Sequence, residues 1–325
     1  MILVTGATGF IGSHLVDTPG LRGEPVRALV RRTTLFDKTS VELVRGDLVT
    51  GEGLALALRG VDTVIHLAGT TKPLSIGQYY SGNVRATENL ARAVVSASAA
   101  IGRPIRMVHV SSLAAVGPGP NSTPLTEDAE PHPITHYGKS KLEGERVVRA
   151  ILPDAVIVRP PAVYGPRDTD VFQILKSINQ GMLVQIAGAE RYFSTIYVED
   201  LVDGILAAAR APGASGRTYF LSEASVVPWS ELVDISARIM GKKVRTVNLP
   251  APVAYAVGYG AEVWARVTRK PSIVSRDKIT DMRSPYWICD TRRAKDELGF
   301  EAPTKIEEGL ERALAWYREA GWLKW

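Results

Sequence analysis

The stretch Ile2-Leu3-Val4-Thr5-Gly6-Ala7-Thr8-Gly9-Phe10-Ile11-Gly12 decides the fold of this chain of 325 residues. A short apolar run, typical of a buried strand, passes directly into a glycine-rich loop, and a helical pattern follows. Glycines at such a junction permit a tight turn and let the backbone approach a pyrophosphate, while the helix N-terminus faces the negative charge. We therefore predict a phosphate-binding loop formed by Gly6, Thr8, Gly9, Phe10, Ile11 and Gly12.

Apolar runs alternate with helical patterns through the first half of the chain. The runs are continuous rather than alternating, which is typical of a parallel sheet covered on both faces. They span Ile2 to Thr5, Val26 to Val30, Val41 to Val44, Val61 to Leu67, Ile105 to Ser111 and Ala155 to Val158. The clearest helices are Tyr79 to Ala100 and His136 to Ala150. The fold class is therefore α/β, a doubly wound parallel sheet.

The alternation of apolar runs and helical patterns ends in the second half of the chain. Pro- and Gly-rich segments occur there at Arg159 to Pro166 and Pro250 to Pro252. We predict a coenzyme-binding domain over residues 1–165 and a smaller, mostly helical, substrate-covering part over residues 166–325. Leu201 to Arg210 and Arg217 to Leu221 are expected to return to the main sheet, so this boundary is soft. Further helices are expected near Ala251 to Val267, Thr291 to Leu298 and Lys305 to Ala320. Pro19 should end the first helix near Val16, because proline lacks the amide donor.

Composition excludes several classes of protein. A hydrophobic content of 45% suffices for a full core, and the single cysteine, Cys289, cannot form an internal disulfide. With no signal-peptide pattern at the start, a cytoplasmic location is expected. The net charge of +5 is spread among 34 acidic residues, so no nucleic-acid groove is expected. No stretch reads as a membrane span or as a metal site, and the expected partner is a small-molecule substrate.

Coenzyme choice is expected to depend on the end of the second strand. There an acidic residue takes the ribose 2′-hydroxyl of NAD, or a basic residue takes the 2′-phosphate of NADP. Val30 is followed by Arg31 and Arg32, and the first carboxylate is Asp37. NADP(H) is therefore favoured, with NAD(H) as the alternative if the two arginines are ordinary solvated loop charges.

Tyr137 and Lys141 form the candidate catalytic pair. They are four residues apart on one predicted helix and therefore share a face. An unperturbed tyrosine has a pKa of about 10, so it transfers protons poorly at neutral pH. An adjacent ammonium favours the phenolate and makes the tyrosine a better proton-transfer group. Ser111 and Ser112 close the run Ile105 to Val110, at the sheet edge where such folds bind ligands. The alternatives to a catalytic role are that Tyr137 and Lys141 are ordinary surface residues and that the serine belongs to a turn.

Together these motifs resemble the extended, or atypical, short-chain dehydrogenase/reductases of the NAD-dependent epimerase/dehydratase superfamily. The matching segments are TGATGFIG at 5–12, GDL at 46–48, HLAG at 66–69, VSSLAAVG at 110–117, YGKSK at 137–141 and RPPAVYGP at 159–166. They cover nearly the whole chain in the order typical of that family. The resemblance implies an oxidoreductase with a nicotinamide coenzyme, and a homodimer fits the same family.

The resemblance also implies roles for individual residues. Ser112, Tyr137 and Lys141 match the catalytic residues, with Ser112 a better match than Ser111, and Lys141 also holds the nicotinamide ribose. Asp47 and Leu48 match the pair beside the adenine, and Asn83 matches a recurrent asparagine that we interpret as structural. The remaining expected coenzyme contacts are Leu67, Ala68, Gly69 and Val163.

Two positions separate branches of this family. Nucleotide-sugar epimerases and dehydratases usually hold substrate phosphates with an asparagine and an arginine, where this chain has Ala162 and Phe193. Val26 to Arg31 and Pro285 to Asp290 look more like the dihydroflavonol-reductase and hydroxysteroid-dehydrogenase branches. The leading expectation is hydride transfer between nicotinamide and an apolar carbonyl or alcohol, with the apolar helix Ala251 to Ala265 as a pocket cover. The alternatives are an NAD(P)-dependent nucleotide-sugar epimerase or dehydratase, and a non-catalytic cofactor-sensing protein.

Overall fold

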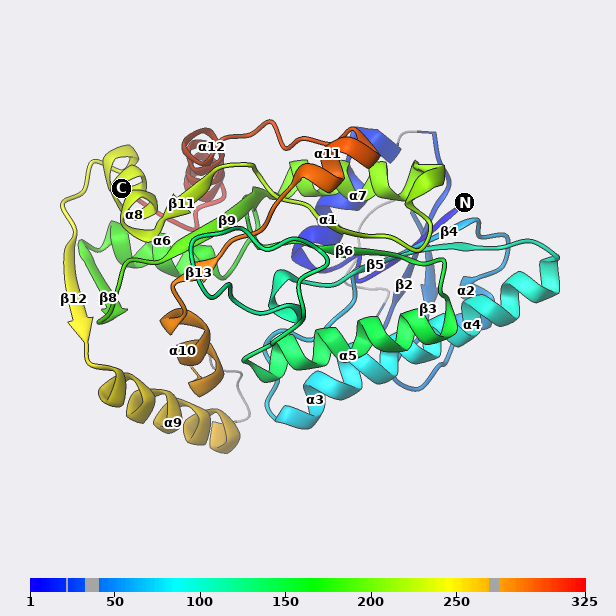
Figure 1. Ribbon diagram of the computed structural model, residues 1–325, viewed down its shortest axis with the longest axis horizontal. Coiled ribbons are helices and arrows are strands. Elements are labelled where there is room, and N and C mark those ends of the chain that lie inside the picture. The colour runs from blue at the N-terminus through cyan, green and yellow to red at the C-terminus, as the bar shows by residue number, and fades with distance from the viewer. Residues whose placement is uncertain (22, 33–40, 269–274) are drawn as a thin grey trace.

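The computed structural model describes all residues of the chain except 22, 33–40 and 269–274. Its centre is a seven-stranded sheet in the order β10-β6-β5-β4-β1-β2-β3, in which every neighbouring pair is parallel (Figure 1). The strands are β1 (Ile2–Thr5), β2 (Val26–Val30), β3 (Val41–Arg45), β4 (Thr63–His66), β5 (Arg106–Val110), β6 (Val156–Arg159) and β10 (Thr218–Phe220). The predicted doubly wound α/β fold is confirmed.

Helices cover both faces of this sheet because its strands are apolar on both sides. Alternate residues of β1 point to opposite faces, so Val4 packs in one core with Leu15 and Leu201, while Leu3 packs in another with Leu90. One face is covered by α1 (Phe10–Asp17) and α7 (Val198–Arg210), and the other by α2 (Leu54–Ala57), α4 (Ala86–Ile101) and α5 (His136–Ile151). Figure 1 shows α5 and α4 side by side below the sheet.

The remaining elements lie mainly beyond the sheet edge that carries the carboxyl ends of the strands. A second sheet joins β11 (Val226–Pro228), β9 (Tyr192–Tyr197) and β13 (Tyr286–Trp287), with β7 (Ala162–Tyr164) paired to β9, and β12 (Arg245–Leu249) pairs with β8 (Met182–Ile186). The helices are α6 (Val171–Asn179), α8 (Trp229–Ile239), α9 (Ala251–Thr268), α10 (Arg276–Arg283), α11 (Arg292–Leu298) and α12 (Ile306–Glu319). Tyr164, Leu310 and Tyr317 belong to the buried core of this region.

Several local features differ from the sequence-based expectations. The first helix ends at Asp17, one residue past the expected Val16, and a single 3₁₀ turn, Pro19–Leu21, follows. The long helix expected from Tyr79 is divided into α3 (Ile76–Tyr80), a π-helical turn (Ser81–Arg85) and α4. The short strands of the second half were not predicted, because each has two to six residues with mixed burial. As expected, β10 joins the main sheet and α7 packs on it.

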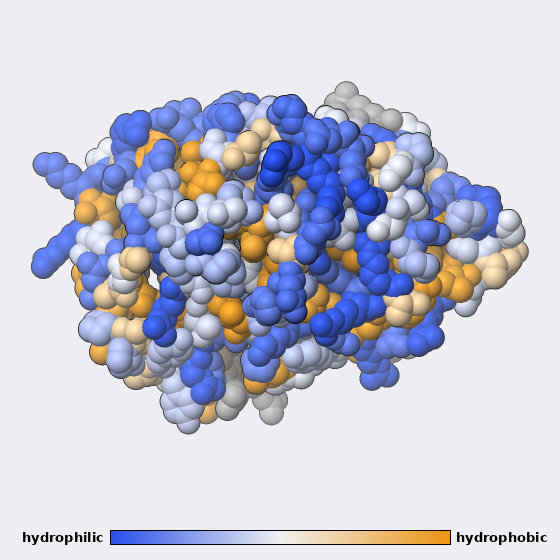
Figure 2. Space-filling view, in the orientation of Figure 1, coloured by the Kyte–Doolittle hydropathy of each residue, from blue (hydrophilic) through white to orange (hydrophobic). Residues whose placement is uncertain are grey.

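The molecular surface mixes polar and apolar groups. On the face shown in Figure 2, hydrophilic residues predominate and hydrophobic ones appear in small scattered groups. Within the part of the chain that the structure describes, no helix is both long enough and apolar enough to cross a membrane.

Candidate active site

The glycine loop brings β1, α1 and the end of β4 into close contact. Gly6 has a φ of 77°, and a Cβ there would lie 2.6 Å from the backbone nitrogen of Ala68. A Cβ on Gly12 would lie 2.1 Å from the carbonyl oxygen of Gly6, so neither position accepts a side chain. Gly9 begins α1 without a side-chain cap, and Thr8 beside it is exposed. The first amides of the helix are therefore not taken by a side chain of the N-cap, as a phosphate site requires.

Ile11 and Phe10 hold the loop from the other side. Ile11 packs against the core between the sheet and α7, and the Phe10 ring meets His14 edge to face at 5.8 Å. These contacts are structural, and they fix the direction in which α1 leaves the loop.

The predicted adenine-side residues follow two neighbouring strands. Arg31 and Arg32 are exposed directly after β2, while Asp37 lies outside the described residues. Asp47 and Leu48 follow β3 in a turn, in which the Asp47 carboxylate accepts a hydrogen bond from the Val49 amide at 2.7 Å. Both arginines therefore follow β2 at the end of the sheet where the glycine loop follows β1.

Asn89 of α4 fixes this turn, a role that no sequence pattern indicated. Its amide nitrogen donates to the carbonyl oxygens of Leu48 and Val49, at 2.9 and 3.0 Å. The turn after β3 is thereby held to the helix that covers it.

The segment after β4 connects the glycine loop to the candidate catalytic helix. The Leu67 amide donates to the Thr5 carbonyl, and the Ala68 amide donates to the Thr5 hydroxyl at 3.4 Å. A Cβ on Gly69 would lie 3.0 Å from Asn83 Oδ1 and 3.9 Å from Lys141 Nζ. Leu67, Ala68 and Gly69 therefore lie between β1 and Lys141.

The three candidate catalytic residues converge at the ends of β5 and α5. Ser112 lies close enough to Tyr137 to lower the pKa of its hydroxyl, and Lys141 is buried one turn further along α5. Ser112 also accepts the Ala114 amide at 3.2 Å, so it caps the 3₁₀ turn Leu113–Ala115. A close approach of α5 makes this convergence possible, because a Cβ on Gly138 would lie 2.2 Å from the Ala114 carbonyl oxygen.

Ser111 is placed differently from its neighbour. Its hydroxyl is buried and has no hydrogen-bond partner, and it is not joined to Tyr137. Of the two serines, Ser112 is thus the one whose hydroxyl meets the tyrosine.

Burial sets the protonation of the catalytic pair. It raises the pKa of Tyr137, while the hydrogen bond with Ser112 opposes that rise. Burial lowers the pKa of Lys141 to about 8, with the Glu145 carboxylate acting in the opposite direction. The Lys141 ammonium donates to the Val110 carbonyl oxygen at 2.8 Å. At neutral pH the site therefore holds a neutral phenol and a lysine that is close to losing its proton.

Two histidines lie beneath this site. His66 and His109 are fully buried and their rings stack at 5.3 Å. Burial and, to a smaller extent, the Lys141 charge lower the pKa of His66 to about 3. Burial also holds the pKa of His109 well below its usual value, and neither of its ring nitrogens has a partner. Both rings are therefore neutral at physiological pH and add no competing positive charge beside Lys141.

A chain of buried hydrogen bonds joins these elements. His66 lies 2.7 Å from the Thr5 hydroxyl through Nδ1 and 3.0 Å from the Thr87 hydroxyl through Nε2. Thr87 donates to the Asn83 carbonyl, and the Asn83 amide donates to the Ser140 hydroxyl at 2.9 Å. The Ser140 hydroxyl in turn donates to the Tyr137 carbonyl at 2.7 Å.

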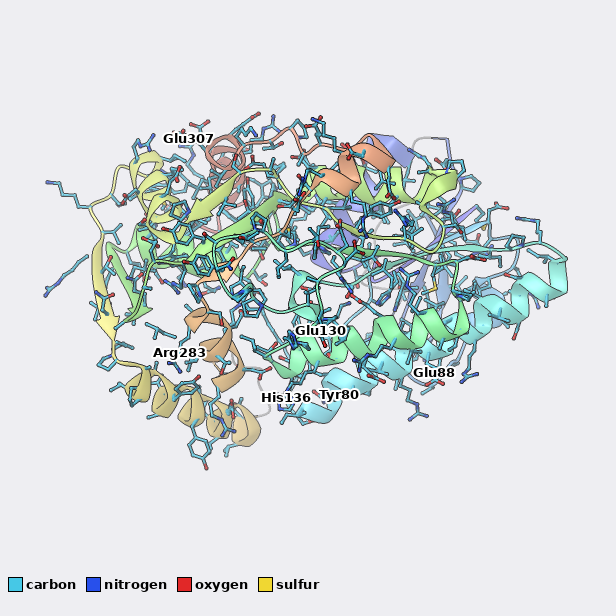
Figure 3. All side chains as sticks on the ribbon, viewed as in Figure 1. Tyr80, Glu88, Glu130, His136, Arg283 and Glu307 are labelled. Carbon is cyan, nitrogen blue, oxygen red and sulfur yellow. The ribbon has the colours of Figure 1, made fainter. Side chains whose placement is uncertain are left out.

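Helix α10 contributes residues that the sequence did not point to. The Asp277 carboxylate accepts the backbone amides of His136 and Tyr137, at 2.8 and 3.4 Å, and so caps the first turn of α5 (His136 is labelled in Figure 3). The Lys278 ammonium lowers the pKa of Tyr137, against Asp281 and Asp170, which raise it. A carboxylate at a helix N-terminus is stabilising, so α10 both covers and positions the tyrosine.

Ala162 and Phe193, the two positions that separate branches of the resembling family, lie on β7 and β9. Ala162 is exposed at the start of β7, and the neighbouring Val163 pairs with Ile196 of β9. Phe193 packs beside Trp287 and meets the Trp229 ring at 6.1 Å. Arg191, the cation nearest to Phe193 along the chain, is buried and stacks on Trp229 at 4.7 Å, and its Nη1 donates to the Met282 carbonyl. That guanidinium therefore holds β9, α8 and α10 together.

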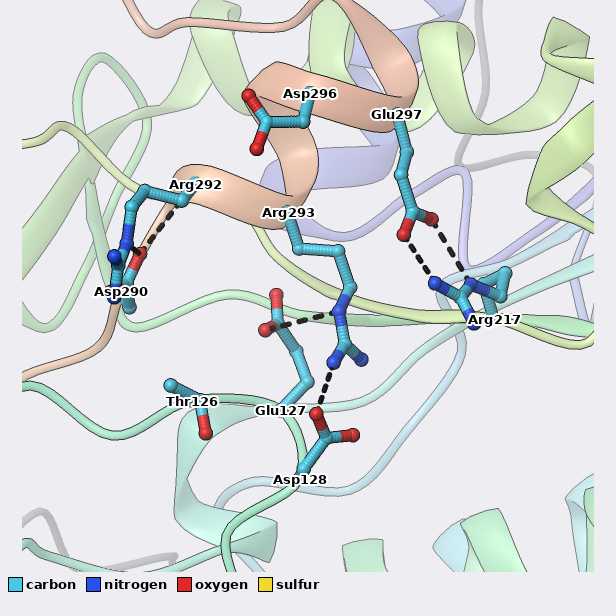
Figure 4. Close-up of a pocket in the computed structure, with 9 residues that line it drawn as sticks. All are labelled: Thr126, Glu127, Asp128, Arg217, Asp290, Arg292, Arg293, Asp296 and Glu297. Carbon is cyan, nitrogen blue, oxygen red and sulfur yellow. Dashed lines mark hydrogen bonds and ion pairs between the residues drawn. The ribbon is translucent and has the colours of Figure 1, made fainter.

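A surface hollow of about 390 Å³ lies away from these residues (Figure 4). It is lined by charged side chains that pair with one another, Arg217 with Glu297 and Arg293 with Asp128. These pairs hold α11 against β10 and the loop 126–128. We assign no catalytic role to the hollow. Among the described residues, no cluster of three or more His, Cys, Asp or Glu side chains could hold a metal ion.

Comparison with known proteins places this geometry in a family. Residues 2–221 match the model of the NAD dependent epimerase/dehydratase family. The chain is similar to ceramide reductase of Caulobacter vibrioides (strain NA1000 / CB15N), with 31% identity over 99% of this chain and 96% of the relative. It is also similar to N-acetyl-alpha-D-glucosaminyl-diphospho-ditrans,octacis-undecaprenol 4-epimerase of Escherichia coli O157:H7, with 27% identity over 96% of this chain and 94% of the relative. The solved structure of MoeE5 in complex with UDP-glucuronic acid and NAD has a TM-score of 0.79 and 27% identity, covering 98% of this chain and 99% of that one.

The depressed pKa of Lys141 predicts a pH dependence of stability. From its ordinary value of 10.5, the pKa falls to about 8 in the folded protein, so between these values the unfolded chain holds a proton that the folded protein has lost. Stability due to this group is therefore lowest below pH 8 and rises as the pH rises, by on the order of 1 kcal/mol per pH unit.

The measurement is urea unfolding of the wild type and of Lys141→Met across this pH range. The free energy of unfolding of the wild type should rise relative to that of Lys141→Met, and the exposed Lys139→Met controls for loss of a surface lysine. A difference that stays flat with pH would contradict the assignment.

Proposed function

Given that the chain belongs to the NAD-dependent epimerase/dehydratase family, we propose that it is an NADP(H)-dependent oxidoreductase that transfers hydride between nicotinamide and a carbonyl or alcohol carbon. The observation that carries this proposal is the convergence of Ser112 and Tyr137 with the buried Lys141. A proton-transfer group, an oxygen-orienting hydroxyl and a tuning ammonium are the parts that such a reaction needs.

The residues around the glycine loop fit a dinucleotide. The first amides of α1 can meet a pyrophosphate, and the segment Leu67 to Gly69 lines the path from the loop to Lys141. When bound, the nicotinamide supplies or accepts the hydride. Asp47 and Leu48 would hold the adenine side, and Val163 would line the nicotinamide side.

Side chains of the protein would supply the proton that the reaction needs. In the reductive direction a hydride and a proton convert the carbonyl to an alcohol, so the site must hold a proton donor beside the substrate oxygen. Ser112 would orient that oxygen and the Tyr137 hydroxyl would donate to it, while Lys141 would stabilise the phenolate that remains. Burial favours the neutral phenol of Tyr137, which is the form that donates, and this favours reduction.

The substrate proposed is a carbonyl compound with a long apolar part. Ala162 has no side chain that could bind a phosphate, and Phe193 packs into an apolar cluster. The names of the two relatives described above each include a lipid, ceramide in one and an undecaprenol-linked sugar in the other.

A nucleotide-sugar epimerase is the second candidate. It is favoured by the 4-epimerase relative and by the NAD and UDP-sugar in the MoeE5 complex. In that reaction the same tyrosine would pass a proton while the coenzyme is regenerated within each turnover.

The cytoplasmic location and the homodimer that the sequence and the family resemblance suggested are also part of the proposal.

Removal of the tyrosine hydroxyl tests the proposed chemistry. We expect Tyr137→Phe to lower turnover by about 100-fold or more, because a positioned proton-transfer group is lost. Folding and coenzyme affinity should change little, whereas Lys141→Ala should impair both turnover and coenzyme affinity. The measurement is NADPH oxidation with ketones and aldehydes of increasing chain length, with UDP-glucose and UDP-glucuronic acid as a separate arm. Turnover within a few-fold of wild type for Tyr137→Phe would remove this residue from the mechanism.

Coenzyme choice gives a second test. The exposed guanidinium groups of Arg31 and Arg32 can make charge-assisted hydrogen bonds to a 2′-phosphate, so NADPH should bind more tightly than NADH. Changing both arginines to alanine should erase most of that preference, whereas the exposed Arg92→Ala on α4 should leave it unchanged. Titration calorimetry at low salt measures both affinities. Equal affinities in the unmodified protein would be incompatible with this role.

A further inference from the structure

Helix α9 exposes an apolar face that the proposed reaction does not use. Seven exposed apolar positions recur at helical spacing, and the exposed Tyr259 lies beside them: Val253, Ala256, Val257, Gly260, Val263, Trp264 and Val267. The side chains of Val257, Trp264 and Val267 are 52%, 69% and 76% exposed. Scattered exposed apolar residues are ordinary, but a continuous row with a tryptophan marks an interaction surface.

The opposite face of α9 is fixed to α10, which determines the direction of the exposed row. A Cβ on Gly258 would lie 2.5 Å from the Ile279 side chain, and the Tyr255 hydroxyl is 3.0 Å from that of Thr280. Glu262 forms an ion pair with Arg276 at 2.8 Å. In Figure 1, α9 lies at the margin of the molecule and α10 stands between it and the rest of the chain.

The excess positive charge of the protein lies in the segment of sequence that contains this helix. Residues 242–283 contain nine Lys and Arg and three Asp and Glu, a net charge of +6. The rest of the chain carries a net charge of −1, so this segment accounts for the whole excess of +5. Lys243 and Arg245, which precede α9, are both exposed. An apolar helix face with basic residues in the same segment is complementary to a surface with anionic headgroups above an apolar interior.

The same helix pair reaches the candidate active site. Asp277 of α10 accepts the amides of His136 and Tyr137, and the Lys278 charge acts on the Tyr137 hydroxyl. The exposed face of α9 is therefore separated from the candidate catalytic tyrosine by one helix.

We propose that the outer face of α9 docks on an anionic lipid bilayer, with the helix lying in the plane of the interface. At about 27 Å, an 18-residue helix lies flat on such a surface, and Trp264 and the valines enter the boundary between headgroups and acyl chains. Basic side chains before and after the helix contact the anionic headgroups. Docking on the bilayer does not depend on the proposed reaction. The purpose that we assign to docking does rest on the proposed function: it would let the protein receive a lipid-like carbonyl compound from the bilayer.

Vesicle sedimentation of the full chain tests the proposal. The protein should bind vesicles of phosphatidylcholine and phosphatidylglycerol, bind vesicles of phosphatidylcholine alone more weakly, and be released from the first by salt. Val257→Gln and Trp264→Gln should each lower the partition coefficient by about tenfold, because each removes an apolar side chain from the interface without changing charge. Leu56→Gln is the matched control, since Leu56 is 50% exposed on α2, and it should bind within about twofold of wild type.

A second set of measurements makes the outcomes decisive. Each variant should keep the thermal unfolding transition and the NADPH affinity of the wild type, because the changed residues lie on the surface. Absence of binding to the anionic vesicles, or equal losses in Leu56→Gln, would overturn the proposal. A dimer of the wild type that Trp264→Gln converts to a monomer, with unchanged vesicle binding, would assign the face to a second copy of the chain. Neither outcome depends on turnover, so failure here is distinguishable from failure of the proposed reaction.

Discussion

The side-chain amide of Asn83 is the interaction on which the candidate site depends. Asn83 is 2% exposed, in the π-helical turn before α4. Its oxygen accepts the Thr70 amide at 2.6 Å, and its nitrogen donates to the Thr70 carbonyl at 3.0 Å and to the Ser140 hydroxyl at 2.9 Å. One side chain thus joins the segment that follows β4 to the helix that carries Tyr137. Loss of such a buried donor leaves its partners unsatisfied and costs about 1–3 kcal/mol.

The same region holds groups that stability alone would not favour. Lys141, His66 and His109 are buried together, and both ring nitrogens of His109 lack partners. Burial of an ammonium and of unpaired polar atoms is unfavourable, so other contacts must offset it. The buried ion pair of Arg159 with Glu145, at 2.7 Å, fastens α5 to β6, and Asp277 caps the start of the same helix. Anchoring at its start and in its middle lets α5 hold a proton-transfer group and a lysine of lowered pKa in one place.

Sequence patterns predicted those parts of the molecule that depend on local chemistry. Continuous apolar runs marked the central strands, the glycine spacing marked the tight turn between β1 and α1, and the spacing of Tyr137 and Lys141 placed both on one helix face. Asp277 escaped notice because it lies 140 residues from Tyr137 and no local pattern links them. The apolar pattern of α9 suggested a pocket cover, but hydrophobicity does not say which way a helix faces. The structure directs its valines outward and places α10 nearer to Tyr137.

In the proposed reductase, a buried polar network holds the phenol, the serine and the lysine, and an apolar helix nearby faces outward. The most direct test of this proposal is the stoichiometry of coenzyme use during complete conversion of a substrate by the purified protein. We predict that the protein purifies largely free of coenzyme and oxidises NADPH one-for-one with the alcohol formed. Tightly held NAD in the purified protein, with interconversion of UDP- or dTDP-sugars in the absence of added coenzyme, would contradict it.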